Sequence, residues 1–343
     1  MKIKFLIGTI AAAFGAATAA HAAGSSVELR MGDSLPPGHI ISENSTKPWM
    51  QAVDRLSEGK IKIKYFPAEQ VGKAKDMLSL TQSGVLDIGY VGPAYVSDKM
   101  PLSAVAELPG SFGTACQVMK AYWSLAKEGG YLYEKEFKPN KIRPLFIAAL
   151  PPYQMVVGSK KDLKKLGDFE GLKLRASGGA QDLTLRKLKV VPVKMAPPEI
   201  YESMSRGTID GTLLSFVSVE SYKLSPLVKS ATLGSNFGTV VVTYSISDAK
   251  WNRLPKDVQD LLAKAGDEVT NQACVRFDQQ ESEAVERLRK AGVNFVKFDD
   301  ADLQYLHGAF DDVAQNWAKE LDARKRPGSE TLKAFREALA NVK

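Results

Sequence analysis

Histidine and cysteine are scarce in this 343-residue chain, which contains three histidines and two cysteines. Neither the G-x-S-x-G pattern of a serine nucleophile elbow nor the H-E-x-x-H pattern of a zinc protease occurs. His39 and His307, the two histidines beyond the N-terminal segment, lack the spacing of metal ligands. We therefore expect a protein that is not an enzyme and that has no cofactor and no metal site.

Long apolar runs are also missing, except at the N-terminus. A basic start, Met1-Lys-Ile-Lys, precedes an apolar stretch that runs from Phe5 to an A-x-A cleavage site, Ala20-His21-Ala22. This pattern is typical of a secretory signal peptide, and the apolar stretch is short for a membrane anchor. We expect residues 1–22 to be removed and the mature chain to be exported to the periplasm in soluble form.

A strong charge of either sign is absent as well. The chain has 46 lysines and arginines against 39 aspartates and glutamates, which gives a formal net charge of +7. The positive excess is scattered and forms no long basic block, so binding to nucleic acid is not indicated. A mild positive field does suit a small anionic ligand.

Cys116 and Cys274 are the only cysteines. An even number of cysteines in an exported chain permits one disulfide, whereas two separate buried thiols are the alternative. Because the exported chain holds this pair and no third thiol, we predict a bridge between them.

The remaining sequence alternates between strand and helix patterns. Short alternating or apolar segments are separated by segments with helical spacing, and this rhythm predicts an α/β fold with mostly parallel sheets. Pro151-Pro152 stiffens the chain midway and marks a predicted crossing between two lobes. The main strand patterns fall at residues 27–32, 60–66, 86–91, 172–176, 190–194 and 209–214.

The C-terminal third carries a long helical pattern from residue 254 to residue 291, with a weak break expected at Gly266. Within it, residues 279–286 are interpreted as a solvated helix face. The acid-rich segment that follows, Asp299 to Asp302, is predicted to cap a helix. It lacks the central glycine and terminal glutamate of a calcium loop.

One strand pattern carries a candidate binding residue. Residues 172–176 alternate apolar and basic side chains, and Ser177-Gly178-Gly179 ends the strand before a helical pattern. Arg175 therefore lies near the carboxyl end of a strand, where ligands bind in open α/β sheets. Its planar group of donors fits a carboxylate at two points. The alternative is an ordinary solvated arginine.

Several segments, taken together in their order and spacing, resemble the periplasmic solute-binding proteins of TRAP transporters (tripartite ATP-independent periplasmic systems). The resemblance covers the whole mature chain. The strand with Arg175 and the E-x-Y…G-x-x-D-G element are its most specific parts. The segments are Asp33–His39, Glu69-Gln-Val-Gly72, Leu86-Asp-Ile-Gly89, Gly171-Leu-Lys-Leu-Arg175 and residues 197–211.

The resemblance implies a two-lobed periplasmic-binding-protein fold, in which each lobe is a mostly parallel sheet flanked by helices and one long helix bridges both lobes. We expect lobe I to comprise residues 23–151 and about 240–280, and lobe II to comprise residues 152–239 and about 281–343. The ligand would lie in a cleft between the lobes. In this family the matched arginine forms a two-point salt bridge with the carboxylate of an organic acid, and Arg175 inherits that role.

The sequence departs from a common family pattern at three places. Asp210-Gly211 is followed by Thr-Leu-Leu-Ser-Phe216 instead of a polar segment with a ligand-binding asparagine. The crossing strand offers Tyr153 and Gln154 where many relatives have a second arginine. The Glu-Trp pair that holds a metal-bound keto acid is missing. These departures argue against a sugar acid or a metal chelate as the ligand.

Other residues are predicted to line the site because of their places beside strand ends or loops. For each one a structural role is the alternative: a solvated loop for His39, turn chemistry for Tyr90 and Pro93, and core packing for Met195. The full predicted ligand-binding set is Arg175, His39, Tyr90, Pro93, Tyr153, Ser177, Met195, Ser215, Phe216 and Phe237.

The resemblance implies a monomeric receptor that captures a small organic acid and delivers it to an integral-membrane TRAP permease driven by an ion gradient. An exported sensor module and an exported hydrolase or isomerase are the alternatives. Phe216 and its leucine neighbours favour an aromatic or short apolar acid. With Ser215, Ser218 and bound water, a dicarboxylate or a sugar acid is the alternative ligand.

Overall fold

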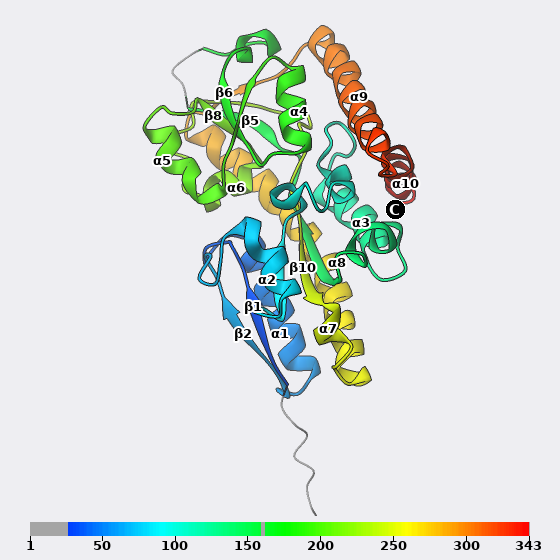
Figure 1. The fold of residues 1–343 in the computed structure, drawn as a ribbon. Helices are drawn as coiled ribbons and strands as arrows, with labels where there is room; N and C mark the ends of the chain where they lie inside the picture. Colours follow the sequence, from blue (N-terminus) through cyan, green and yellow to red (C-terminus); the bar gives the residue numbers. More distant parts are fainter. Residues whose placement is uncertain (1–26, 159–161, 343) are drawn as a thin grey trace, which may run out of the picture.

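The fold is known from a computed structural model that describes residues 27–158 and 162–342 (Figure 1). The predicted signal peptide and its cleavage site lie outside the described residues. Two sheets, each flanked by helices, form an upper and a lower lobe in this view. In the part of the chain that the structure describes, no helix is long and apolar enough to cross a membrane.

The first sheet lies in the lower lobe and has the strand order β2-β1-β3-β10-β4. β10 runs antiparallel to both of its neighbours, whereas β2, β1 and β3 are parallel to one another. β10 and most of β4 are fully buried, as expected for strands covered on both faces. The strands are β1 (Val27–Gly32), β2 (Ile61–Phe66), β3 (Ile88–Val91), β4 (Ile142–Ala149) and β10 (Val241–Ser247).

The second sheet has the order β11-β9-β5-β8-β6-β7. It too contains one strand, β5, that runs antiparallel to both neighbours. Each sheet is therefore mostly parallel, and the predicted fold class is confirmed. The strands are β5 (Gln154–Val157), β6 (Lys173–Ala176), β7 (Val191–Lys194), β8 (Gly211–Leu214), β9 (Ser230–Thr232) and β11 (Asn294–Val296).

Two segments cross between the sheets side by side. The predicted crossing at Pro151-Pro152 lies between β4 and β5, and residues 233–240 return the chain from β9 to β10. The Tyr153 amide donates to the Gly238 carbonyl (2.8 Å), and the Phe237 amide donates to the Tyr153 carbonyl (3.1 Å). These bonds make the two crossing segments one short two-stranded connection between the lobes.

Helices cover both sheets. The turn η4 (Leu102–Glu107) packs against α4, while α9 packs against α4 and α10 packs against α3. Asp299 caps α9 by accepting from the Asp302 amide (2.8 Å), which confirms the predicted cap. The helices are α1 (Lys47–Leu56), α2 (Met77–Gln82), α3 (Ala115–Ala126), α4 (Ala180–Lys187), α5 (Ile200–Ser205), α6 (Phe216–Ser221), α7 (Asp248–Trp251), α8 (Lys256–Lys290), α9 (Asp300–Ala323) and α10 (Gly328–Ala340).

The long helix α8 runs from the lower lobe into the upper one (Figure 1). Its 35 residues correspond to a length of about 52 Å. The weak break expected at Gly266 is wrong, because α8 continues through it. A β-carbon on Gly266 would lie 1.8 Å from the Leu145 carbonyl oxygen, so this glycine allows α8 to lie directly on β4.

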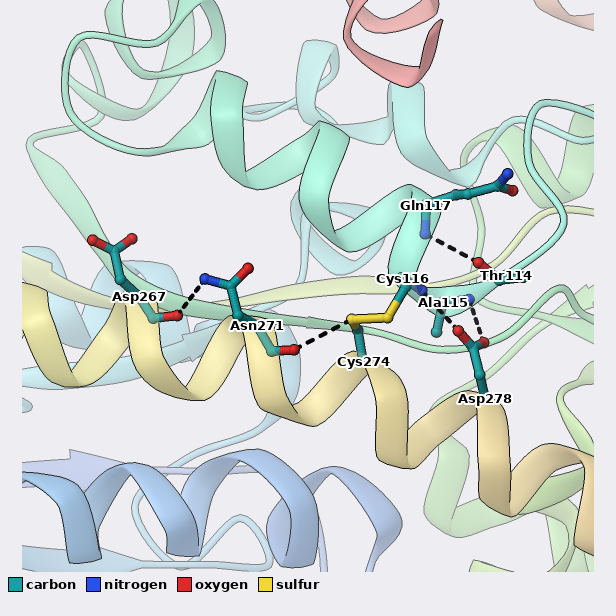
Figure 2. Close-up of a disulfide and its surroundings, with 8 residues drawn as sticks. All are labelled: Thr114, Ala115, Cys116, Gln117, Asp267, Asn271, Cys274 and Asp278. Atoms are coloured by element: carbon teal, nitrogen blue, oxygen red, sulfur yellow. Dashed lines mark hydrogen bonds between the residues drawn. A yellow bond between two sulfur atoms is a disulfide. The ribbon is translucent and has the colours of Figure 1, made fainter. Parts of the chain in front are cut away.

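The predicted disulfide is confirmed: Cys116 of α3 and Cys274 of α8 are bonded, with their Cα atoms 4.6 Å apart (Figure 2). One turn further along α8, the Asp278 carboxylate accepts from the amides of Ala115 and Cys116 at the start of α3. These two amides have no partner within the helix, so Asp278 acts as a distant cap. α3 is thus joined to α8 both covalently and by hydrogen bonds.

The next turn of α8 forms hydrogen bonds with the start of α6, the helix that follows β8 of the second sheet. The Glu281 carboxylate accepts from the amides of Phe216 and Val217 (both 2.9 Å), the first residues of α6. The Gln280 side-chain oxygen accepts from Asn44 in the first lobe (2.6 Å). The interpretation of residues 279–286 as a solvated face was therefore wrong for these two positions, because α8 contacts both lobes there.

Candidate functional site

Arg175 lies in β6, paired with Val193 on one side and Thr212 on the other. Gly178 and Gly179, both with positive φ, turn the chain immediately after the strand so that α4 can begin. The Arg175 side chain is only 1% exposed. The alternative of a solvated arginine is therefore excluded.

The guanidinium of Arg175 is only partly satisfied. Its Nε donates to the Met195 carbonyl (3.0 Å), whereas its Nη2 has no hydrogen-bond partner. Within the described residues, no carboxylate lies within ion-pair distance of Arg175. A buried cation without a counter-charge is costly, because both desolvation and missing hydrogen bonds oppose it. The site therefore has the chemistry to bind an anion.

Further buried polar atoms near Arg175 also lack partners. They include the Ser177 hydroxyl, which follows Arg175 by two residues, and both carboxylate oxygens of Glu107. One oxygen of Asp182, in the first turn of α4, also has no hydrogen-bond partner. Burial raises the pKa of this carboxyl, and the charges of Lys194, Arg186 and Arg175 oppose the rise. Buried polar groups in native proteins are nearly always paired, so such a group of unpaired atoms indicates a binding site.

Glu107 ends η4 in the first half of the chain and was not predicted from the sequence. A β-carbon built on Gly179 would lie 3.9 Å from Glu107 Oε2, which places the carboxyl beside the turn that follows Arg175. Burial raises the pKa of Glu107 to about 8. The nearby amides of Val241 and Ala94 and the charge of Arg175 oppose this rise, without reaching hydrogen-bond geometry.

Tyrosines from both lobes surround this group. Tyr153, on the crossing segment, is close enough to Arg175 and Glu107 for their charges to affect its pKa. Burial raises the pKa of Tyr153 and of Tyr90 in β3 well above the usual range, so both stay neutral. Tyr95 and Tyr222 interact electrostatically with both residues, although the sequence did not identify either one. The structure thus brings the predicted Tyr153 near Arg175, and Tyr90 near Tyr153.

His39 lies in the loop after β1 and is 1% exposed, so the alternative of a solvated loop histidine is wrong. Burial lowers its pKa to about 3, and the ring is neutral. Its Nδ1 accepts from the Ile41 amide (3.2 Å), while its Nε2 has no partner. The ring lies 4.8 Å from that of Tyr222, between ring centroids.

This contact joins the two lobes. Beside it, the Ile40 amide donates to the hydroxyl of Ser221 in α6 (3.2 Å). The loop after β1 belongs with the first sheet, and α6 follows β8 of the second. The lobes therefore touch on the side of the site formed by His39 and Tyr222.

The remaining predicted residues have less direct contacts with this group. Met195 contacts Arg175 through its carbonyl, and Pro93 begins the turn that follows β3. The Ser215 hydroxyl shares a hydrogen bond with Ser218 (2.9 Å). The rings of Phe216 and Phe237 pack against other aromatic rings, Phe216 against Phe295 and Phe237 against Phe298 and Phe310. Their role as ligand-facing walls stays a prediction.

Residues 27–158 and 162–342 contain no group of three or more histidine, cysteine, aspartate or glutamate side chains that could hold a metal ion. The carboxyl groups of Asp182 and Glu107 both lie near Arg175, because its charge affects the pKa of each.

Comparisons with known proteins match this chain over most of its length. The family model described as bacterial extracellular solute-binding protein, family 7, matches residues 31–320. The crystal structure of a TRAP periplasmic solute binding protein from Bordetella bronchiseptica, with bound (R)-mandelate and (S)-mandelate, is 27% identical to this chain. It has a TM-score of 0.81 and covers 92% of this chain and 100% of its own.

Two relatives with assigned ligands are similar over most of their length. The monocarboxylate 2-oxoacid-binding periplasmic protein of Nostoc is 28% identical over 296 residues, 84% of this chain and 78% of the relative. The C4-dicarboxylate-binding periplasmic protein DctP of Rhodobacter capsulatus is 25% identical over 317 residues, 88% of this chain and 90% of the relative. The three proteins bind different acids.

Proposed function

This chain belongs to the bacterial extracellular solute-binding proteins of family 7, and from this premise we propose that it is a periplasmic receptor for a small organic acid. The observation that carries the proposal is the buried guanidinium of Arg175, which has an unpaired Nη2 and no carboxylate within ion-pair distance among the described residues. A ligand carboxylate would supply the missing charge and accept the missing hydrogen bond.

Binding would proceed without a chemical step. The carboxylate exchanges its water shell for Arg175 and the unpaired donors around it, while the loop of His39 closes against Tyr222 and Ser221. Closure excludes water, which strengthens each polar contact inside. Opening of the same contacts would release the acid to an integral-membrane TRAP permease, as the family premise implies.

We propose an aromatic or short apolar carboxylic acid as the ligand. Tyr153 and Tyr222 lie near Arg175, and Tyr90 lies near both of these tyrosines. The three rings would offer flat, largely apolar surfaces to the ligand body. Ligand pockets commonly combine such walls with a few fixed polar groups. The mandelate bound by the Bordetella bronchiseptica protein is an acid of this kind.

A thermal-shift panel with the mature protein tests this proposal. The panel contains benzoate, mandelate, a branched 2-oxo acid, succinate and glucuronate. A ligand at about a hundred times its dissociation constant adds about 2.7 kcal/mol of stability, which moves the melting temperature measurably. Mass spectrometry of the small molecules that co-purify with the protein provides a second, unbiased readout.

We expect clear shifts with the aromatic or 2-oxo acids and little effect from succinate or glucuronate. Shifts confined to glucuronate or succinate would contradict the ligand class and leave the receptor proposal standing. If every acid fails and no acid co-purifies, the receptor proposal itself is wrong.

A further inference from the structure

Glu107 is the least satisfied carboxyl near Arg175. Its side chain is fully buried, and neither of its oxygens has a hydrogen-bond partner. Its backbone is held tightly: a β-carbon on Gly238 would lie 2.3 Å from the Glu107 carbonyl oxygen, so the returning crossing segment packs directly on it. The position of the carboxyl beside the turn after β6 is therefore fixed by the fold.

The charged and titratable groups near Glu107 come from four elements. Arg175 approaches from β6, Tyr122 from α3 and Tyr153 from the crossing segment. Asp182 lies in the first turn of α4, which packs against η4. Burial keeps both tyrosines neutral, and Arg175 is the one cation that affects the pKa of Glu107, without forming an ion pair with it.

The ionisation of Glu107 decides what the site can bind. An ionised carboxylate would repel a ligand carboxylate that approaches Arg175, and it would instead attract an ammonium group. A neutral carboxylic acid carries an O–H donor and can bind the same ligand carboxylate. Burial raises the pKa of Glu107 to about 8, which leaves the group mostly protonated at neutral pH.

We propose that Glu107 is a protonated hydrogen-bond donor of the binding site, so that the ligand carboxylate is held between the Arg175 guanidinium and the Glu107 carboxylic acid. The inference rests on the proposed receptor function and narrows its ligand class. The favoured ligands are acids that carry no ammonium group beside the carboxylate. An α-amino acid would place its ammonium next to Arg175 without an ionised acceptor.

Calorimetry of mandelate and benzoate binding between pH 6 and pH 9 tests this inference, because both acids stay ionised over this range. The proteins are the wild type, Glu107→Gln and Glu136→Gln. Glu136 is a matched control: its pKa is also raised by burial, but its oxygens accept from the amides of Leu102 and Ser103.

For a free-protein pKa of about 8, deprotonation of Glu107 weakens wild-type binding about ten-fold between pH 7 and pH 9. Glu107→Gln retains a donor, so its affinity at pH 7 stays within about three-fold of the wild type and changes little with pH. Glu136→Gln keeps the pH dependence of the wild type. A wild-type affinity that does not vary with pH would overturn the inference, as would a Glu107→Gln variant that loses binding of both acids.

A second readout needs no ligand. If the folded protein holds the Glu107 proton, Glu107→Gln and the wild type have similar melting temperatures at pH 4, below the ordinary carboxyl pKa of 4.5, and the wild type loses stability as the pH rises from there through 8. The variant then becomes the more stable protein at pH 9. A melting-temperature difference that is the same at both pH values would overturn the inference even if the receptor proposal failed. Conversely, the melting-temperature difference could depend on pH in a protein that binds none of the acids. That result would contradict the receptor proposal and leave the protonation of Glu107 standing.

Discussion

The disulfide between Cys116 and Cys274 permits a quantitative prediction of stability. It closes a loop with a sequence separation of 158 residues, and in the chain-entropy treatment a loop of that length contributes about 5 kcal/mol at 25 °C. Removal of native disulfides generally costs less than this limit, because denatured chains keep some structure. We expect the Cys116→Ala/Cys274→Ala double variant to lose about 2–5 kcal/mol of unfolding free energy.

Guanidinium denaturation of the oxidised wild type and the double variant measures this loss. The variant should still fold, because Asp278 continues to accept from the amides of Ala115 and Cys116 and fixes α3 on α8. Its affinity for an acid ligand should be unchanged, since the bridge does not touch the group around Arg175. A loss below about 1 kcal/mol would refute the reasoning from loop length.

Three further predictions concern α8 and buried acids. Glu281→Ala removes the acceptor of two amides at the start of α6, and denaturation should show a loss of about 2–4 kcal/mol, whereas the exposed Glu283→Ala control should change little. Gly266→Ala forces a β-carbon against the Leu145 carbonyl and should destabilise the protein by more than about 1 kcal/mol. Gly308 in α9 has open space around it, so Gly308→Ala should be neutral or stabilising in the same assay. Burial raises the pKa of Asp33 from 3.8 to about 6, so the stability that its proton supplies is complete below pH 3.8 and is lost as the pH rises through 6. Relative to Asp33→Asn, the wild type should lose about 3 kcal/mol of unfolding free energy over this range. A difference in unfolding free energy that stays constant with pH would contradict the raised pKa of Asp33.

The sequence was sufficient to predict the architecture because the patterns involved are local. Strand alternation, the Pro151-Pro152 pair and the Asp299 cap depend on neighbouring residues, and the structure has each of them. The resemblance to TRAP solute-binding proteins is confirmed by the family match. The cysteine pair was predictable because an exported chain with two cysteines allows only one bridge.

The site was predictable only in part, because its members meet through tertiary contacts. Arg175 carried a local signal, a basic residue before a glycine turn at a strand end. Glu107 lies in an apolar turn, and nothing in its neighbourhood indicates that it packs beside Gly179, which follows 72 positions later by the numbering. Tyr222 and Glu281 were missed for the same reason, since their partners come from distant elements.

The central claim is that Arg175 binds the carboxylate of the ligand, and calorimetry on Arg175→Ala tests it most directly. The acid with the largest thermal shift is titrated into the wild type, Arg175→Ala, and Arg206→Ala, an exposed control in the same lobe. Removal of one side of a buried charged pair costs about 2–5 kcal/mol, which corresponds to at least about a thirty-fold loss of affinity. We expect this loss for Arg175→Ala and none for Arg206→Ala, whereas an unchanged affinity of a folded Arg175→Ala protein would contradict the account.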